Sequence, residues 1–212
     1  MARILIIGAS NGIGLETVKS ALAAGHTVRA FARTASKIAI DDAHLEKFDG
    51  DARDEAAIVN ALKGEDAVVL SLGVALNAET ILRGTRLFSE ATRTLVDAMT
   101  AAGPRRLIVV TGIGAGSSRA ALGLLYGTAF QFSLKRIYDD KDVQEMIVTR
   151  SSLDWTIVRP GILTNDASTA CRALLDPKDW KPGPVSRAAV AKYIVDHLSD
   201  AAAMRQTPLL IA

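Results

Sequence analysis

Near its N-terminus the chain reads Ile4-Leu5-Ile6-Ile7-Gly8-Ala9-Ser10-Asn11-Gly12-Ile13-Gly14. The apolar run predicts a buried strand, and the glycines after it open a helix. In that setting Gly8 permits a tight turn, Gly12 lets the backbone approach a pyrophosphate, and Gly14 lets the helix pack closely on the sheet. The helix N-terminus adds N–H groups and a positive dipole end. We therefore expect a dinucleotide site rather than a plain glycine-rich turn. The contacting residues would be Gly8, Ser10, Asn11, Gly12, Ile13 and Gly14.

Short apolar runs alternate with helical segments along most of the chain. Several runs are continuously apolar, which is typical of strands covered on both faces in a parallel sheet. The alternation predicts an α/β fold with a doubly wound sheet of about seven strands, flanked by helices, in one domain over residues 1–212. The expected strands are residues 3–7, 27–32, 45–48, 67–71, 106–111, 155–158 and 209–211. The expected helices are residues 12–25, 54–62, 85–101, 135–150 and 187–198.

The composition is that of an ordinary globular protein. Of 212 residues, 49% are hydrophobic and 23% charged, which argues against disorder. The 25 Lys and Arg nearly balance the 23 Asp and Glu, so we expect no nucleic-acid partner. The single cysteine, Cys171, fits a reducing compartment. No apolar stretch approaches the ~20 residues of a membrane span, and no secretory signal pattern is present. These features predict a cytoplasmic protein with no membrane partner.

The end of the second expected strand selects the dinucleotide. NAD-binding proteins usually place an Asp or Glu there to accept the ribose 2′-hydroxyl. This chain instead has Arg33, and no acidic residue follows until Asp41. A guanidinium pairs with a 2′-phosphate, whereas a carboxylate repels it. The sequence therefore predicts NADP(H) as the cofactor; the alternative is that Arg33 is a solvated surface residue.

Two further strand ends carry weaker signals. Asp51-Ala52 follows the third expected strand, where the Asp51 carboxylate is placed to accept a hydrogen bond from the adenine amino group. Leu72-Gly73 follows the fourth, where Gly73 leaves room for a ribose. An Asp after a strand is also common turn chemistry, so neither signal would stand alone.

Together these segments resemble the atypical short-chain dehydrogenase/reductases. The nearest likeness is to the biliverdin-IXβ reductase/flavin reductase group and to the nitrogen-regulator (NmrA-like) NAD(P)-binding proteins. The resemblance implies a Rossmann-like sheet in the order 3-2-1-4-5-6-7, and it places Pro160, Gly161, Ile162 and Leu163 beside the nicotinamide. The glycine spacing, Gly-x3-Gly-x-Gly, is that of typical rather than atypical members. The matching segments are residues 8–14, 31–33, 50–52, 71–73, 107–111 and 152–161.

The catalytic pattern of that family is incomplete here. Its members usually combine a Ser after the fifth strand with a Tyr-x3-Lys pair on the next helix. Lys141 matches the lysine, but Ile137 stands four residues before it, and Tyr138, three before it, is displaced by about 100° around a helix. Thr111 is the hydroxyl in register with the serine. We expect Thr111 to contact the substrate or the nicotinamide amide and Lys141 to hold a ribose hydroxyl. The alternatives are a locally packed threonine and a solvated lysine.

The missing tyrosine argues against ketone–alcohol interconversion by the usual acid–base route. Hydride transfer to an acceptor that takes its proton from water remains, as the resemblance to flavin and biliverdin reductases implies. The first hypothesis is thus an NADPH-dependent oxidoreductase acting on a small conjugated acceptor such as a flavin, quinone or enone. The second is a non-catalytic NADP(H)-sensing regulatory protein. A nucleotide-sugar epimerase or dehydratase needs the same tyrosine and ranks last.

Two segments follow strand ends and interrupt the alternation. Residues 114–134 are rich in Gly, Ala and bulky apolar residues, and residues 165–184 contain Trp180 and three prolines. Ligands of open α/β sheets bind at such strand ends, so we assign both segments to the substrate side. Trp180 is a candidate stacking partner for a planar substrate or an oligomer contact. The alternative is that both segments are surface loops or form an oligomer contact. We expect the protein to be a monomer or a homodimer.

Overall fold

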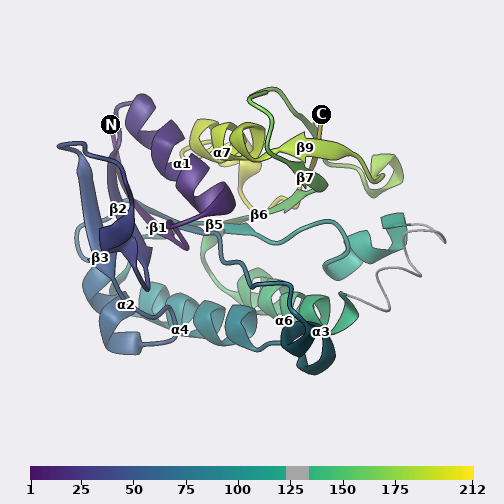
Figure 1. Cartoon of the computed structure of the whole chain (residues 1–212), viewed down its shortest axis with the longest axis horizontal. Coiled ribbons are helices and arrows are strands. Elements are labelled where there is room, and N and C mark those ends of the chain that lie inside the picture. Colours follow the sequence, from purple (N-terminus) through teal and green to yellow (C-terminus); the bar gives the residue numbers. More distant parts are fainter. Residues whose placement is uncertain (123–133) are drawn as a thin grey trace.

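The computed structural model describes residues 1–122 and 134–212. An eight-stranded sheet, in the order β3-β2-β1-β4-β5-β6-β10-β8, runs through the centre of the protein (Figure 1). Its first seven strands are parallel, and their order confirms the expected 3-2-1-4-5-6-7, with β10 as the seventh strand. The strands are β1 Arg3–Ile7, β2 Thr27–Ala32, β3 Leu45–Asp49, β4 Ala67–Leu70, β5 Arg106–Val110, β6 Asp154–Pro160, β10 Leu209–Ile211 and β8 Arg172–Leu174.

The eighth strand was not expected from the sequence. β8 is three residues long, pairs antiparallel with β10, and exposes Arg172 and Ala173. Its strand character comes from backbone pairing with β10 and not from an apolar pattern of its own. A separate pair of parallel strands, β7 Ile162–Thr164 and β9 Pro184–Ser186, flanks the same end of the sheet.

All five expected helices are present. Three of them start at a side-chain cap: Asn11 accepts from Gly12 N, Asp54 from Ala56 N and Ser186 from Ala189 N. A short additional helix, α3 Ala78–Arg83, buries none of its residues, which explains why no apolar stripe predicted it. The expected helices are α1 Gly12–Ala23, α2 Glu55–Ala61, α4 Leu87–Ala102, α6 Lys135–Arg150 and α7 Arg187–Asp196.

These helices form a layer on each face of the sheet. α1 and α7 lie side by side on one face, and α2, α4 and α6 cover the other (Figure 1). The first strand shows why both faces are apolar: Ile4 and Ile6 pack into the α1/α7 layer, and Leu5 and Ile7 pack into the opposite layer. This three-layer arrangement confirms the doubly wound, Rossmann-like fold.

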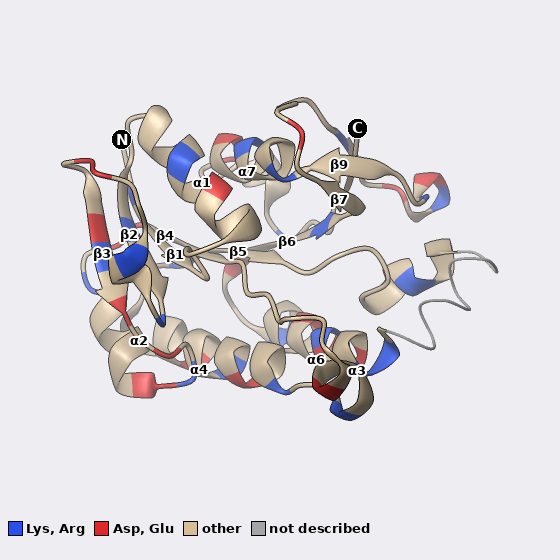
Figure 2. Ribbon diagram, viewed as in Figure 1, with Lys and Arg blue, Asp and Glu red and all other residues tan. Residues whose placement is uncertain are grey.

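Charged residues are interspersed along the elements of both layers in this view, with the two signs mixed (Figure 2). Within residues 1–122 and 134–212, no helix combines the length and apolar character needed to cross a membrane. Of the two segments assigned to the substrate side, 165–184 is described throughout. Residues 114–134 are described only to 122 and from 134, so the expectation for 123–133 lies outside the described residues.

Candidate functional site

The glycine-rich turn is enclosed by three strands. Gly8 has φ +88°, donates to the Phe31 carbonyl at 2.9 Å, and faces the Ser71 carbonyl oxygen, which would lie 2.2 Å from a Cβ at this position. A Cβ on Gly14 would lie 2.1 Å from the Gly8 carbonyl oxygen. Side chains at these two positions would displace the backbone, so the predicted turn and the predicted close helix packing are both present.

The third glycine faces open space. Gly12 has φ +56°, and a Cβ built on it would meet only the Arg187 Nε, at 3.9 Å. Among residues 1–122 and 134–212, a Cβ on Gly73, after β4, would meet no atom within 4 Å. These two glycines leave open space, Gly12 at the start of α1 and Gly73 after β4, and open α/β sheets bind phosphate and ribose groups at such places.

The other predicted turn residues divide into exposed and buried groups. Ser10 and Asn11 are exposed, and the Asn11 Oδ1 accepts from Gly12 N at 2.7 Å. The Ile13 side chain is buried in the core with Ile4 and Ile6, which leaves only its backbone amide to face a ligand. Exposed polar groups thus surround the glycine-rich turn, and apolar packing of Ile13 fixes the start of α1 against the sheet.

The ends of β2 and β3 carry an exposed arginine and a carboxylate that is already hydrogen-bonded. Arg33 is exposed directly after β2. Asp51 accepts from the Arg53 backbone N–H at 2.9 Å and from its guanidinium Nη2 at 2.7 Å. These bonds, with a smaller contribution from Arg33, hold the pKa of the Asp51 carboxyl at about 2. Arg53 was not predicted from the sequence. It forms a local turn with Asp51, and its hydrogen bonds occupy part of the acceptor capacity of the Asp51 carboxylate.

The remaining strand-end positions contribute shape. Ala52 is buried, and Leu72 is half-buried against the same core. Ser36, near Arg33, donates its backbone N–H and its hydroxyl to Asp49, and these hydrogen bonds lower the pKa of the Asp49 carboxyl. Asp49 is therefore already hydrogen-bonded within this corner, and Arg33 and Lys37 are exposed cations close to it in the chain.

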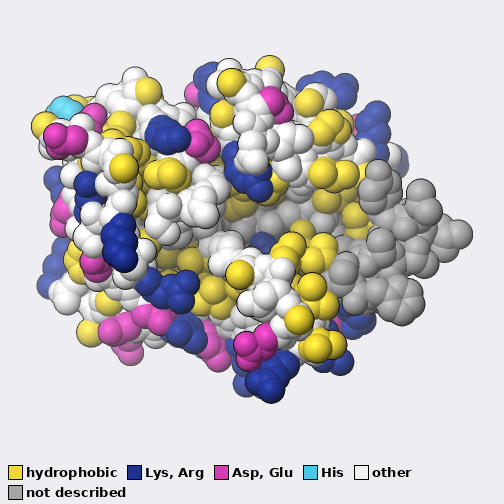
Figure 3. Space-filling model, viewed as in Figure 1, with side chains coloured by type: hydrophobic (Ala, Val, Ile, Leu, Met, Phe, Trp, Pro, Cys, Tyr) yellow, Lys and Arg dark blue, Asp and Glu magenta, His cyan; other side chains and the backbone are white. Residues whose placement is uncertain are grey.

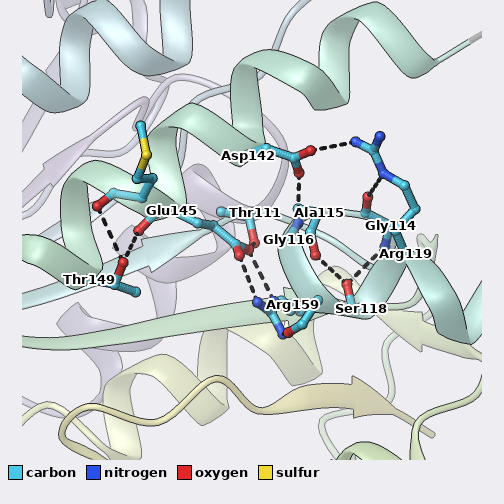
Figure 4. A network of polar contacts seen from close by, with 12 residues as sticks. Thr111, Gly114, Ala115, Gly116, Ser118, Arg119, Asp142, Glu145, Thr149 and Arg159 are labelled. Carbon is cyan, nitrogen blue, oxygen red and sulfur yellow. Dashed lines mark hydrogen bonds and ion pairs between the residues drawn. The ribbon is translucent and has the colours of Figure 1, made fainter.

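A buried polar network lies where β5, β6 and α6 meet (Figure 4). The Thr111 hydroxyl donates to Glu145 Oε1 at 2.8 Å. Arg159 donates through Nε to the same oxygen at 3.0 Å and through Nη2 to Oε2 at 2.6 Å. Arg159 is the only charged residue among the buried positions of β6, and a charge there needs a partner, so the sequence did carry a signal for this pair. Sequence reasoning gave neither Arg159 nor Glu145 a role in the site.

The same network fixes the loop after β5. Gly116 has φ +53°, and a Cβ there would lie 2.2 Å from Glu145 Oε2. Asp142 accepts from Gly116 N and from Arg119 Nη2, each at 2.7 Å (Figure 4). Burial is the main cause that raises the pKa of the Asp142 carboxyl. The described start of the 114–134 segment is thus pinned to α6.

Lys141 is buried rather than solvated. Its Nζ donates to the Thr111 carbonyl at 2.8 Å and lies 4.4 Å from the centre of the Phe88 ring. Burial lowers the pKa of Lys141 to about 8, against the opposing effect of nearby Glu145 and Asp140. The structure therefore brings Thr111 and Lys141 together, as expected, but directs this ammonium toward the backbone of β5.

Tyr138 reaches the end of β5 in spite of its shifted spacing. Its hydroxyl lies 2.8 Å from the position that a Cβ on Gly112 would occupy, and its ring centre is 5.7 Å from Lys141 Nζ. Burial raises the pKa of the Tyr138 hydroxyl. Tyr138 and Lys141 are neighbours, but the lysine does not give the tyrosine a lowered pKa.

The segment expected beside the nicotinamide is shaped by close backbone packing. Pro160 is buried, and a Cβ on Gly161 would lie 2.2 Å from the Gly183 carbonyl oxygen. Ile162 is 47% exposed. Trp180, expected as a substrate or oligomer contact, is instead buried: its Nε1 donates to the Leu174 carbonyl and its ring lies 5.0 Å from the Arg159 guanidinium.

The surface at this end of the molecule is hollowed. Figure 3 shows a depression between the α1/α7 half and the α4/α6 half, with hydrophobic side chains gathered along its border. Its floor lies over the region where the central strands end (Figure 1). Open α/β sheets bind their ligands at this place.

The fold is the Rossmann-like fold in which proteins bind dinucleotides at a glycine-rich turn after the first strand. The chain belongs to the NAD(P)H-binding family, whose pattern matches residues 8–201. It is 28% identical over 204 residues to the uncharacterized chloroplastic protein At2g34460 of Arabidopsis thaliana, covering 92% of this chain and 71% of that protein. It is 30% identical over 194 residues to sterol demethylase protein B of Methylococcus capsulatus, covering 86% of this chain and 55% of that longer protein.

Solved structures give the same result. ChuY, an anaerobillin reductase from Escherichia coli O157:H7, superposes with a TM-score of 0.80 at 28% identity, over 99% of this chain and 96% of that one. A short-chain dehydrogenase/reductase of the wide type from Veillonella parvula, in complex with NADP, has a TM-score of 0.79 at 19% identity, over 100% of this chain and 94% of that one. The first is a similar reductase, and the second shows the shared fold. The expected resemblance to atypical short-chain dehydrogenase/reductases is confirmed.

Proposed function

We propose that the protein is an NADPH-dependent oxidoreductase that transfers hydride to a small conjugated acceptor of the flavin, quinone or enone type. The closed arrangement of polar groups after β5 carries this proposal. Thr111 donates to Glu145, Lys141 donates to the Thr111 carbonyl, and burial raises the pKa of Tyr138. A reductase that protonates an alkoxide needs a lysine that lowers the pKa of its catalytic tyrosine. Here the pKa of Tyr138 is raised instead, so the site is not arranged for that chemistry.

A conjugated acceptor suits such a site because its proton can come from water after the transfer. Bound NADPH supplies the hydride. The chain itself then has to orient the two reactants and keep water from the reacting carbon. The hollow bordered by hydrophobic side chains (Figure 3), with exposed Ile162 after β6, supports both tasks.

Selection of NADPH over NADH is assigned to Arg33. Its exposed guanidinium follows β2 at the position where NAD-binding proteins carry an acid. Asp51 nearby stays ionised, with a pKa of about 2, and is held by Arg53. The 2′-phosphate would bind to Arg33, and the adenine edge would lie over Asp51 and Ala52.

Two residues near the nicotinamide have assigned roles that the hydrogen-bond geometry permits. The Thr111 hydroxyl uses its proton on Glu145, which leaves its oxygen as an acceptor for the nicotinamide amide or the substrate. Lys141 has three N–H donors, of which one is directed to the Thr111 carbonyl, and we assign it a ribose hydroxyl. Pro160, Gly161 and Ile162 would line the opposite side of the ring.

The required partners are NADPH and one small-molecule acceptor. Net charge is only +2, and both signs are interspersed in the view of Figure 2, which supports the expectation of no nucleic-acid partner. Cys171, the single cysteine, fits a reducing compartment, so we place the activity in the cytoplasm. A monomer or a homodimer meets these requirements.

The decisive experiment is NADPH consumption by the purified protein over a panel of flavins, quinones and enones, with NADH in parallel. Cofactor binding is measured separately by fluorescence. Turnover with preference for NADPH supports the proposal. Tight NADPH binding without turnover on any acceptor contradicts it and favours the second candidate, an NADP(H)-sensing regulatory protein, which also needs no catalytic tyrosine.

Thr111 offers a residue-level test of the same proposal. Thr111→Val removes the hydroxyl, so turnover should fall while NADPH affinity is largely retained. Thr111→Ser keeps the hydroxyl and should retain most of the turnover. If Thr111→Val turns over as fast as the parent protein, Thr111 has no part in the reaction.

A further inference from the structure

Arg187, the first residue of α7, presents an unused edge of its guanidinium to the glycine-rich turn. Its Nη1 donates to the Thr164 carbonyl at 3.1 Å and to Asn165 Oδ1 at 2.7 Å. Its Nε is the atom that a Cβ on Gly12 would meet, at 3.9 Å. Over the described parts of the chain, neither Nε nor Nη2 has a hydrogen-bond acceptor. The Nε/Nη2 edge is the side of arginine that binds a phosphate with two parallel hydrogen bonds.

The electrostatic setting of Arg187 is unusual for a structural residue. A cation in the first turn of a helix opposes the helix dipole, and no acidic residue in the first turn of α7 offsets it. Within residues 1–122 and 134–212, Arg187 makes no ion pair with a carboxylate. The N-terminus of α1 lies across the same space and has the same positive sign. Two helix N-termini and one guanidinium therefore converge on the opening above Gly12, an arrangement that an anion would stabilise.

We propose that Arg187 binds the pyrophosphate of the dinucleotide and closes the glycine-rich cradle from the side opposite the turn. The anchoring atoms belong to Thr164 and Asn165, where the 165–184 segment begins. Ser186 also donates to the Ser168 carbonyl. The arginine is thus held by the segment assigned to the substrate side, and it joins that segment to the cofactor. This inference rests only on the NAD(P)H-binding part of the proposed function.

The test compares ligands with and without the pyrophosphate. NADP⁺ and adenosine 2′-monophosphate are titrated calorimetrically into the parent protein and into Arg187→Gln. A lost charge-assisted hydrogen bond should weaken NADP⁺ binding about tenfold or more, with adenosine 2′-monophosphate changed less than twofold. Arg187→Lys keeps the positive charge but cannot form two parallel hydrogen bonds, so it should give an intermediate loss of NADP⁺ affinity. Thermal unfolding of each variant verifies the fold.

Two controls locate the effect. Lys19→Gln removes an exposed charge farther along α1 and should leave both affinities within twofold. Arg33→Gln should weaken both ligands, because both carry the 2′-phosphate. The proposal is overturned if Arg187→Gln binds NADP⁺ as the parent does, or weakens both ligands equally. Should the parent protein show no preference for NADP⁺ over NAD⁺, NADPH selection fails by itself, and NAD⁺ against adenosine, which has no phosphate, tests Arg187 in the same way.

Discussion

Glu145 of α6 and Arg159 of β6 form a two-point ion pair with their side chains 6% and 3% exposed. The guanidinium donates to both carboxylate oxygens, at 3.0 and 2.6 Å, and the Trp180 ring covers it at 5.0 Å. Burying two opposite charges costs desolvation free energy, and their attraction offsets this cost only when their remaining donors and acceptors are also hydrogen-bonded. Thr111 supplies a further hydrogen bond to the carboxylate. The pair joins α6 to the C-terminal end of β6, next to Thr111 at the end of β5.

Removing one member of this pair should be costly. Glu145→Gln leaves the Arg159 charge buried without its counter-ion, which typically costs about 3–5 kcal/mol of unfolding free energy. Urea denaturation of the parent and the variant measures the difference. The exposed Lys192–Asp196 pair is the matched control, and Lys192→Met should cost about 1 kcal/mol or less. A Glu145→Gln loss as small as that of the control would contradict this account of the pair.

The glycines of the site should separate into structural and ligand-facing positions. Gly14→Ala places a Cβ 2.1 Å from the Gly8 carbonyl oxygen, so the turn must move. We expect a loss of about 1–3 kcal/mol in unfolding free energy together with loss of NADPH binding. Gly73→Ala meets no atom within 4 Å and should stay within about 0.5 kcal/mol of the parent.

If a ribose lies over Gly73, the alanine variant should bind NADPH more weakly in spite of its parent-like stability. Stability is followed by urea denaturation and binding by fluorescence titration. Unchanged NADPH affinity in Gly73→Ala would remove this glycine from the site, and a fully stable Gly14→Ala protein would show that the turn tolerates more movement than its packing indicates.

Lys141 should give the stability a distinct pH dependence. Its pKa in the folded protein is about 8, below the value of about 10.4 of an unfolded chain. Between these values the unfolded chain binds more protons than the folded one, so this residue's contribution to stability rises with pH and is lost as pH falls through about 8. The difference in unfolding free energy between the parent and Lys141→Met should therefore shift in favour of the parent from pH 8 to pH 10.

Taking the difference removes the effects of Cys171 and Tyr138, whose pKa values are raised by burial and which are present in both proteins. Urea titrations at closely spaced pH values provide the measurement. A difference that stays flat across this range would mean that Lys141 is not desolvated in the folded protein.

The sequence predicts elements whose signals are local. Strand–helix alternation predicted the parallel sheet. The helices expected from residues 54 and 187 start where they were predicted, because their caps, Asp54 and Ser186, bond within three residues of themselves. α3 and β8 were missed because neither has a buried stripe: α3 has no buried residue, and β8 is a strand only by pairing with β10.

The candidate site divides in the same way. Gly8 and Gly14 were predicted because their constraint is the adjoining backbone turn. The Glu145–Arg159 pair, the burial of Trp180 and the approach of Arg187 to Gly12 join segments far apart in the chain, and no local spacing encodes them. Burial of Lys141 likewise depends on Phe88 from another helix. Tertiary packing decides these features.

Arg33→Asp tests cofactor selection directly. The variant replaces the exposed cation after β2 with a carboxylate beside Asp51, which is already ionised with a pKa of about 2. A 2′-phosphate would lose a charge-assisted hydrogen bond and meet two like charges, so the Kd for NADPH should rise by about tenfold to a hundredfold or more. NADH has a hydroxyl at that position, and this hydroxyl can donate a hydrogen bond to the new carboxylate. The Kd for NADH should therefore change only a few-fold.

The quantity that decides is the ratio of the two Kd values, measured by fluorescence titration. Lys63→Asp makes the same change in charge at the opposite end of the strands, at an exposed position after α2. That control should leave the ratio near the parent value, because solvent and salt screen charges separated by more than about 10 Å. Equal losses of NADPH and NADH in Arg33→Asp would place the arginine outside the 2′-phosphate site, because a residue that touches only the shared part of the two cofactors cannot tell them apart.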